Sequence, residues 1–265
     1  MTEQPKIMII DSVKEEARGI KTFTFREIIN ALPGQFLMLW LPRVNMKPFG
    51  VSYQDEKSFS VTVSNVGEFT NELFKKGKGD KVGIQGPYGN GFSVDKKNVV
   101  LVAGGYGTAP LAFLAEELEK TGVKVRIIIG AKSKEQLVYL ERFENTNIKP
   151  IFSTDDGSYG QKGFTTEVLK EVLEKDKTVD FVYTVGPEIM MKKVIEITDK
   201  YNVGCEASLE RYMKCGFGVC GQCCVDETGE RVCKTGPVYN KSYIKKYITE
   251  FGKYKRDGKG KIEKI

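Results

Sequence analysis

Strand-like and helix-like runs alternate along the middle of the chain, and this alternation limits the possible folds more than any other feature. The run NVVLVAGG (98–105) is continuous and apolar, as in a strand buried on both faces of a sheet. The next run, APLAFLAEELEKTG (109–122), has apolar residues at helical spacing and ends at a glycine. Further strands are predicted at 123–131, 148–157 and 180–186, and helices at 134–145, 164–175 and 187–201. The pattern predicts a doubly wound parallel-sheet α/β domain over 96–203.

The segments on either side of this domain have different residue patterns. Residues 1–95 contain five short runs rich in Val, Ile, Phe and Thr, at 5–13, 20–26, 34–42, 57–66 and 80–89. Gly, Pro and Asp separate them, which predicts an antiparallel β-barrel or sandwich. A short helix is predicted within 67–80. Residues 204–265 lack the alternation and hold all six cysteines, so we expect a small third domain with a basic tail.

The composition excludes several classes of function. The chain has no histidine, which rules out Ser-His-Asp and Cys-His hydrolases and His-ligated zinc or Rieske centres. The net charge of +6 is concentrated in the tail 253–265, so we expect a solvated, poorly ordered tail and no nucleic-acid binding. The apolar runs are too short to cross a bilayer, and the start is too weakly apolar for a secretory signal. We therefore expect a cytoplasmic protein.

The segment CGFGVCGQCC (215–224) contains four of the six cysteines and three glycines. Cys215, Cys220, Cys223 and Cys233 give the spacing C-x4-C-x2-C-x9-C, whose first three positions match plant-type [2Fe–2S] ligation. Glycines give such a loop the freedom to curl around a cluster. Four cysteines can also bind zinc, although zinc ribbons favour two separated C-x2-C pairs. Structural thiols are a third reading, and Cys205 and Cys224 are expected to be bystanders.

Three strand-to-helix turns are candidate nucleotide contacts. In VVLVAGGYGTAPL (99–111), glycines let the chain turn tightly and let a pyrophosphate approach free N–H groups. The candidates in these turns are Gly104, Gly105, Gly107 and Thr108 in the first, Gly186 and Pro187 in the second, and Asp155 and Asp156 in the third. Such glycines also serve tight packing, and paired aspartates also make turns, so each turn has a purely structural alternative.

Taken in order, a β domain, a GG-x-G-x-A-P nucleotide domain and a C-x4-C-x2-C segment resemble the ferredoxin-reductase-like flavoproteins. Within them the chain is similar to the dihydroorotate dehydrogenase B electron-transfer subunit family. The segments SLERYMKCGFGVCGQC, VCKTGPVY, GPYGNGF and DDGSYG carry this resemblance. It implies FAD on the barrel, NAD on the α/β domain and a [2Fe–2S] cluster on the last domain.

The resemblance also implies which barrel residues hold the flavin. KPFGVS takes the place of a basic-Pro-x-Ser segment, with Lys where Arg is common and Gly where Ser is common. A second segment follows on another strand, and a third reads GEFT at the start of a short helix. The implied contacts are Lys47, Pro48, Phe49, Gly50 and Ser52 in the first segment, Thr62, Val63 and Ser64 in the second, and Phe69 and Thr70 in the third.

The implied function is an electron relay without catalytic side chains. The partner would be an FMN-containing dihydroorotate dehydrogenase subunit of pyrimidine biosynthesis, in a heterotetramer of two chains of each kind. Electrons would pass through the cluster and FAD to NAD+. Alternatives are an FAD and [2Fe–2S] reductase subunit of a hydrogenase, a sulfite reductase or a ferredoxin:NADP oxidoreductase. The last group typically has Asp where this chain has Cys215. A zinc-bound, non-redox binding module is the remaining alternative.

Overall fold

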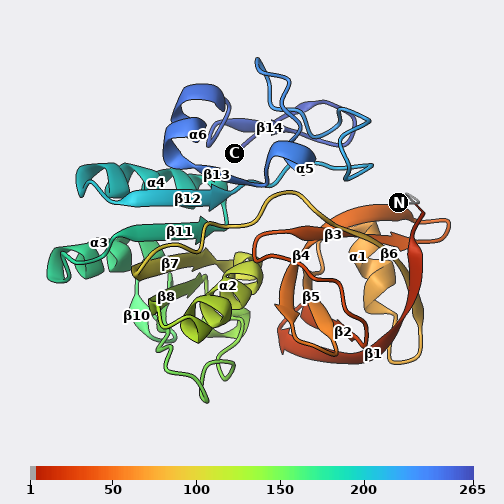
Figure 1. The fold of residues 1–265 in the computed structure, drawn as a ribbon, viewed down its shortest axis with the longest axis horizontal. Coiled ribbons are helices and arrows are strands. Elements are labelled where there is room, and N and C mark those ends of the chain that lie inside the picture. Colours follow the sequence, from red (N-terminus) through yellow and green to blue (C-terminus); the bar gives the residue numbers. More distant parts are fainter. Residues whose placement is uncertain (1–3) are drawn as a thin grey trace.

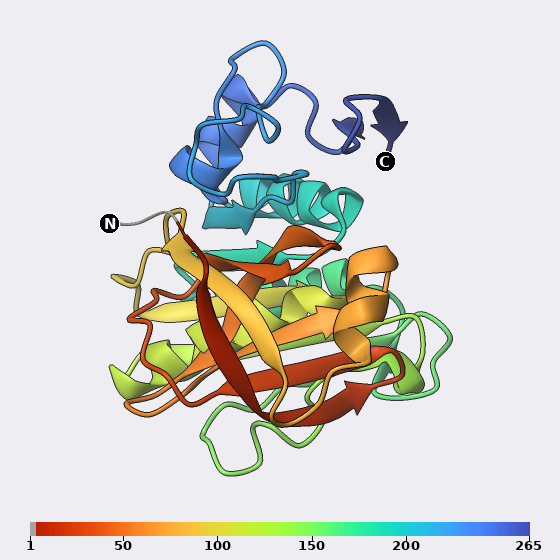
Figure 2. The ribbon, with the colours of Figure 1, turned by 90° about the vertical axis from the view of Figure 1, so that its right-hand side faces the viewer.

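The computed structural model describes residues 4–265 and has three regions (Figure 1). A closed β-barrel lies beside a mainly parallel sheet that carries helices. The C-terminal residues form a smaller region that lies over one end of the sheet and over the rim of the barrel, as the turned view shows (Figure 2). This is the expected fold class.

Six antiparallel strands close the barrel in the order β1-β2-β5-β4-β3-β6. Their inward-facing Phe, Leu, Ile and Val side chains form the barrel core, and Phe25 stacks on Phe59 with ring centroids 5.1 Å apart. The barrel elements are β1 (Lys6–Ala17), β2 (Ile20–Phe25), β3 (Phe36–Leu41), β4 (Asn45–Gln54), β5 (Phe59–Ser64), α1 (Glu68–Phe74) and β6 (Lys81–Tyr88). The five predicted β runs and the short helix are confirmed.

Strand β4 did not stand out in the sequence pattern. Its segment, NMKPFGVSYQ, contains Pro48 and Gly50 and shows no alternation of buried and exposed residues. The strand pairs with β3 along Asn45–Gly50 and with β5 along Val51–Gln54, with an irregularity after Val51. Helix α2 (Thr108–Lys120) of the α/β domain packs on this strand.

The second sheet has the order β10-β9-β8-β7-β11-β12-β13, and all pairs except β12 with β13 are parallel. Its elements after β6 are β7 (Asn98–Gly104), η1 (Gly105–Gly107), α2, β8 (Lys124–Ala131), η2 (Lys134–Gln136), β9 (Ile151–Thr154), β10 (Gln161–Lys162), α3 (Thr165–Lys175), β11 (Phe181–Val185), α4 (Glu188–Lys200) and β12 (Gly204–Ser208). The strand order steps outward in both directions from β7, which is the doubly wound arrangement.

The central strands of this sheet are buried on both faces, as the continuous apolar run predicted. Val100 and Val102 of β7 pack with α3 and α4, whereas Val99 and Leu101 pack with α2. The period of two along the strand therefore divides the hydrophobic residues between two cores. Among residues 4–265, no helix combines the length and the apolar character that crossing a membrane requires.

The predicted helix at 134–145 is wrong: only Lys134–Gln136 form a short 3-10 helix, and turns follow. Three consecutive residues, Leu137, Val138 and Tyr139, are all buried, which a helix with one buried face cannot provide. Tyr139 has a φ of 64°, and its hydroxyl lies 2.5 Å from Thr62 Oγ1 in the barrel. Tertiary contacts with the barrel thus override the local helical pattern.

Arg142 fixes this segment to two neighbours at once. Its guanidinium donates to both carboxylate oxygens of Glu116 on α2, at 2.7 and 2.9 Å, and to the Ser52 carbonyl of β4 at 2.7 Å. The side chains of Arg142 and Glu116 are only 14% and 18% exposed. The contact therefore joins the α/β domain to the barrel through a planar fork.

Replacing Arg142 with Met is expected to lower the free energy of unfolding by about 1–3 kcal/mol, because a partly buried carboxylate and a carbonyl lose their donor. Lysine at this position retains the charge but not the fork, so R142K is expected to recover only some of the loss. Chemical denaturation of the full chain measures both values. Equal stability of R142M and the unaltered chain would contradict this role.

The C-terminal region continues the sheet instead of forming a detached domain. Strand β13 (Val238–Asn240) pairs antiparallel with β12, and the core next to α4 runs on through Cys205, Cys223 and Cys233. The remaining elements are α5 (Val232–Thr235), α6 (Lys241–Tyr247), β14 (Tyr254–Arg256) and β15 (Ile262–Lys264). The boundaries 1–95, 96–203 and 204–265 remain a prediction.

The expectation of a poorly ordered tail is wrong, because β14 and β15 form a two-stranded hairpin. Arg256 donates from Nε and Nη2 to the two carboxylate oxygens of Asp226, both at 2.9 Å. Gly258 lies against the ring of Tyr212, where a Cβ would come within 2.5 Å of the ring. The tail is therefore held against the cysteine-bearing segment by a bidentate ion pair and an aromatic side chain.

Candidate functional site

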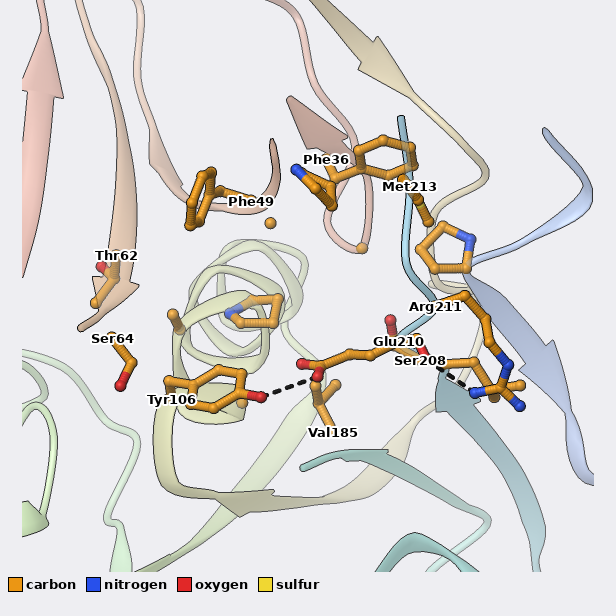
Figure 3. Close-up of a pocket in the computed structure, with 18 of the residues that line it drawn as sticks. Phe36, Phe49, Thr62, Ser64, Tyr106, Val185, Ser208, Glu210, Arg211 and Met213 are labelled. Carbon is orange, nitrogen blue, oxygen red and sulfur yellow. Dashed lines mark hydrogen bonds between the residues drawn. The ribbon is translucent and has the colours of Figure 1, made fainter. Parts of the chain in front are cut away.

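A cavity of about 270 Å³ lies where the three regions of the chain meet (Figure 3). The barrel contributes strands β3, β4 and β5 and the start of α1. The α/β domain contributes the turn after β7 and the end of β11, and the C-terminal region contributes the segment after β12. Its walls are mainly apolar, with a few hydroxyl and charged groups. The lining residues that matter below are Phe36, Pro48, Phe49, Gly50, Thr62, Ser64, Thr70, Tyr106, Gly107, Pro110, Val185, Ser208, Glu210, Arg211 and Met213.

The glycines of the turn after β7 have different roles. Gly105 has a φ of +57°, and a Cβ there would meet nothing within 4 Å, so its backbone faces open space. A Cβ on Gly107 would lie 2.5 Å from the Val185 carbonyl oxygen, and one on Gly104 would lie 2.8 Å from Met190 Sδ. Gly104 and Gly107 are therefore required for packing, whereas Gly105 leaves room for a ligand at the carboxyl end of β7.

The other two candidate turns lie at the same edge of the sheet. Gly186 has a φ of +154°, and a Cβ there would lie 2.7 Å from Met190 Cε; Pro187 caps α4. Asp155 and Asp156 are exposed, and Asp156 accepts from the backbone N–H and hydroxyl of Ser158 at 2.9 and 2.6 Å. These hydrogen bonds give Asp156 the structural role of a turn, and neither the Asp155 nor the Asp156 carboxylate lines the cavity.

Six of the expected flavin residues line the cavity and four do not. Pro48, Phe49, Gly50, Thr62, Ser64 and Thr70 form the barrel wall. Ser52 is fully buried behind that wall, Val63 is buried in the barrel, and Phe69 stacks on Phe49 with ring centroids 5.8 Å apart. The Lys47 ammonium donates to the Tyr212 hydroxyl at 2.6 Å, so it contacts the cysteine-bearing segment.

Two hydroxyls of the barrel wall are already used by protein partners. Thr62 Oγ1 lies 2.8 Å from Thr22 Oγ1, 3.0 Å from Ser52 Oγ and 2.5 Å from Tyr139 Oη. Thr70 Oγ1 accepts from the N–H groups of residues 66 and 67 at 2.9 and 3.0 Å and donates to the carbonyl of residue 67. A threonine hydroxyl has one donor and two acceptor positions. Protein groups therefore occupy all the hydrogen-bonding positions of the Thr62 and Thr70 hydroxyls. A ligand on this wall would meet their methyl groups and the strand backbone.

Three side chains of the cavity wall were not expected from the sequence: Tyr106, Glu210 and Arg211. The Tyr106 hydroxyl donates to Glu210 Oε2 at 2.9 Å, and this bond crosses the cavity (Figure 3). The surrounding protein keeps water away from the phenol of Tyr106 and the carboxyl of Glu210, and this desolvation raises the pKa of both groups. The sequence did hold signals: an aromatic residue between turn glycines, and a Glu-Arg pair placed just before the cysteines.

Arg211 is the centre of a buried ion cluster. Its guanidinium donates to Glu188 at the start of α4 and to Glu250 Oε1, at 3.3 Å from Nε and 3.2 Å from Nη2. The second oxygens of the two carboxylates accept from the N–H groups of Gly252 and Asp226, each at 3.0 Å. The cluster thus joins the turn after β11, the cavity wall and the C-terminal segment.

The cysteine loop has the backbone that the glycine pattern predicted. Gly216, Gly218 and Gly221 have φ values of +81°, +88° and +72°, which favour glycine. The N–H groups of Val219 and Cys220 point at the Cys215 sulfur, at 3.4 and 3.5 Å, and the N–H of Cys233 points at the Cys223 sulfur at 3.4 Å. The loop therefore presents N–H donors to sulfur.

The four thiols form two pairs. The Cys220 thiol lies close enough to Cys215 to help lower the pKa of Cys215, and the Cys233 thiol does the same for Cys223. Within residues 4–265, no three His, Cys, Asp or Glu side chains are grouped so that they could hold one metal ion. Two pairs of thiols match the donor set of a [2Fe–2S] cluster, in which each iron takes two thiolates. The donor set therefore fits the cluster.

The surroundings favour the thiolate at Cys215 and Cys223, one thiol of each pair, whereas the interaction with Cys223 raises the pKa of Cys233. Partial burial opposes ionisation of Cys215, but the N–H groups of Cys220, Val219 and residue 217 outweigh it and lower its pKa to about 7. The hydrogen bond from Cys233 lowers the pKa of Cys223 to about 6. Thiolate is the form that binds iron.

The two expected bystander cysteines differ from these four. Burial raises the pKa of Cys205 to about 12, and its side chain packs in the core beside α4. Burial and the neighbouring Cys223 raise the pKa of Cys224. All six cysteines are free thiols.

Two family models match segments of the chain. Residues 210–245 match the iron-sulfur cluster binding domain of dihydroorotate dehydrogenase B, and residues 101–196 match an oxidoreductase NAD-binding domain. The first segment contains all four paired cysteines, and the second contains the turns after β7, β9 and β11. Both matches agree with the predicted cluster and NAD domains.

Full-length relatives and a solved structure extend these matches. The chain is 51% identical over 259 residues to a protein of Methanocaldococcus jannaschii, with 98% of each chain covered. It is 45% identical over 258 residues to one of Pyrococcus furiosus, covering 97% of this chain and 98% of the relative. Both are named probable dihydroorotate dehydrogenase B (NAD(+)), electron transfer subunit.

The fold is also that of a solved structure from work on flavin-based electron bifurcation by the NADH-dependent reduced ferredoxin-NADP oxidoreductase. The TM-score is 0.80 at 29% identity, and 89% of each chain is covered. Phthalate dioxygenase reductase, described as modular for electron transfer from pyridine nucleotides to [2Fe–2S], has the same fold, with a TM-score of 0.61 at 23% identity over 73% of this chain and 64% of its own. By its full-length relatives and its iron-sulfur segment, the chain belongs to the family of dihydroorotate dehydrogenase B electron transfer subunits.

Proposed function

We propose that this chain passes electrons from a dihydroorotate-oxidising partner subunit through a [2Fe–2S] cluster and FAD to NAD+. A flavin, when bound, exchanges two electrons as hydride with a nicotinamide and single electrons with an iron–sulfur centre. The observation that carries the proposal is the position of the cavity, which borders the barrel, the nucleotide turn and the segment leading to the cysteines.

The cavity and the cysteine loop are adjacent in the chain and in space. Met213 lines the cavity and lies two residues before Cys215. A Cβ on Gly216 would lie 2.5 Å from Cγ of Met38, whose strand β3 also carries the cavity residue Phe36. Cys223 and Cys233 belong to the same hydrophobic core as Phe36 and Met38 of β3. The cysteine loop is therefore packed against the barrel. A flavin in the cavity and a cluster on the loop would therefore be close neighbours.

The residues proposed to hold the flavin are Pro48, Phe49, Gly50, Ser64 and the backbone around Thr62 and Val63. Phe49, stacked on Phe69, and Pro110 opposite Gly50 give this wall flat apolar surfaces. Lys47 and Ser52 support the wall from behind, through Tyr212 and Thr62. Thr70 orders the start of α1, where the resemblance implies a pyrophosphate contact.

The residues proposed to hold NAD lie at the carboxyl edge of the sheet. Gly105 offers open backbone, and Thr108 fixes the turn by donating to the Gly105 carbonyl at 2.7 Å. Gly104, Gly107, Gly186 and Pro187 pack the two turns against each other. Asp155 and Asp156 are left as candidates for the outer portion of the dinucleotide.

The proposed partner is an FMN-containing dihydroorotate dehydrogenase subunit, in a heterotetramer with two chains of each kind. Both relatives are named as electron transfer subunits, which supports a separate catalytic subunit. Val219 is 76% exposed and Cys220 is exposed beside it, so one edge of the cysteine loop reaches the surface. That edge is the point where a partner could receive or deliver an electron.

The test is an anaerobic purification with iron, sulfide and flavin counted on one sample, together with the visible spectrum. About two irons and one FAD per chain are expected, with flavin bands above a broad cluster absorption. Co-expression with a candidate FMN subunit should then give a complex that reduces NAD+ with dihydroorotate. A colourless protein with one zinc per chain would overturn the proposal.

The solved structure with a TM-score of 0.80 favours a second candidate, a reductase subunit for ferredoxin and NADP. The resemblance leads us to expect Asp at the first cluster position of that group, where this chain has Cys215. Complex formation with the FMN subunit, and dihydroorotate-dependent reduction of NAD+, separate the two candidates.

A further inference from the structure

The hydrogen bond between Tyr106 and Glu210 lies across the cavity rather than along its wall (Figure 3). Tyr106 belongs to the turn after β7, and Glu210 lies two residues after the end of β12. These elements are separated in the sheet by β11, whose last residue, Val185, also lines the cavity. The pair therefore bridges two edges of the opening above β11.

The two side chains lie on the open side of the cavity. Tyr106 is 44% exposed and Glu210 is exposed, so solvent reaches the pair from outside. Protein atoms nevertheless crowd both polar groups and raise the pKa of each. A tyrosine turns about two side-chain torsions, so the ring can swing outward once its hydrogen bond is released. The hydrogen-bonded pair therefore lies between the solvent and the interior of the cavity.

The open backbone of Gly105 is next to this pair. A dinucleotide whose phosphates approach Gly105 would direct its nicotinamide toward the barrel wall at Phe49 and Gly50. Tyr106 is the next residue after Gly105, and its ring lines the same cavity as Phe49 and Gly50. A nicotinamide that reached this wall from Gly105 would therefore have to pass the ring of Tyr106.

We propose that Tyr106 and Glu210 form a gate that must open before a nicotinamide ring reaches the flavin. The gate rests on the proposed function. Opening requires the loss of the hydrogen bond, so the closed gate lowers the apparent affinity for NADH. A hydrogen bond to a carboxylate is worth more than one between neutral groups, which makes the effect measurable.

The experiment is stopped-flow reduction of the bound flavin by NADH in the full chain, which gives a Kd and a limiting rate. Y106F keeps the ring and removes the hydrogen bond, so its Kd should be about 3- to 10-fold lower. The limiting rate and the flavin content should stay within about twofold, because the ring is retained. In an E210Q background, where only a neutral hydrogen bond remains, Y106F should lower Kd by less than about twofold.

Y201F is the matched control, because Tyr201 donates to Glu174 at 2.8 Å on the outer face of α3 and α4. It removes a tyrosine–glutamate bond of the same kind and should leave Kd unchanged. A Y106F variant with an unchanged or higher Kd would overturn the gate while leaving the electron relay intact. A chain whose flavin is not reduced by NADH at all would overturn the relay, and the gate with it.

Discussion

Replacing Cys223 with serine is expected to remove the iron–sulfur cluster while leaving the flavin in place. Cys223 is buried, is paired with Cys233 and belongs to the core shared with the sheet, so it cannot be substituted by a neighbouring thiol. Iron should fall from about two per chain to near none, and the broad visible absorption should disappear. The flavin bands should remain, because none of residues 214–236, which include all four proposed cluster ligands, lines the cavity.

The functional consequence is a separation of the two half-reactions. Reduction of the flavin by NADH should continue at a similar rate, whereas transfer between this chain and the FMN subunit should fall by several orders of magnitude. C224S is the matched control: Cys224 is adjacent in sequence, has a raised pKa and is outside the two pairs. Loss of iron in C224S, or its retention in C223S, would contradict the ligand assignment.

Replacing Arg211 with Met is expected to cause a large loss of stability, about 3–5 kcal/mol, because two buried carboxylates lose their cation. Glu188 and Glu250 are as inaccessible as Arg211 itself, with side-chain exposures of 6%, 3% and 3%. Thermal and chemical unfolding of the full chain measure the loss. The triple variant R211M/E188Q/E250Q removes the two unpaired carboxylate charges and should recover much of the lost stability. If the triple variant is no more stable than R211M, the unpaired carboxylates are not the cause of the loss.

The loss in R211M should depend on pH in a definite direction. Burial already raises the pKa of Glu250 in the folded chain, and Arg211 opposes that rise. A carboxylate with a raised folded pKa favours folding at low pH and loses that contribution as the pH rises through the folded pKa. Without Arg211 the rise is larger, so R211M should be least stable at alkaline pH and approach the unaltered chain toward about pH 5.

The fold could be predicted from the sequence where local pattern and packing agree. The period-two burial of β7 and the helical spacing of α2 point to the same sheet, and glycines that need positive φ identify the cysteine loop. Where long-range contacts decide, the pattern failed. Residues 137–143 look helical but pack flat against the barrel through Tyr139 and Arg142. The lysine-rich tail looks solvated but is held by Asp226.

The candidate site divides in the same way. The cysteines and the turn glycines could be found because spacing and backbone freedom are local properties. The Tyr106–Glu210 bond joins residues 104 positions apart, and the Arg211 cluster joins Glu188 to Glu250, which lie on either side of the cysteine loop in the sequence. No periodicity marks such pairs. The family resemblance identified the barrel wall but not its detail: Thr62 lines the cavity with its hydroxyl already used by three protein groups.

The pairing of β12 with β13 joins the nucleotide domain and the cysteine-bearing region into a single mechanical body. Many electron carriers are tethered by flexible linkers and swing between donor and acceptor, so that diffusion of the tethered piece limits turnover. Here the shared sheet and the contact of Gly216 with Met38 of the barrel hold the cysteine loop against both other regions. The internal electron step should therefore proceed at a rate that does not change with solvent viscosity, and only the encounter with the partner should slow in glycerol.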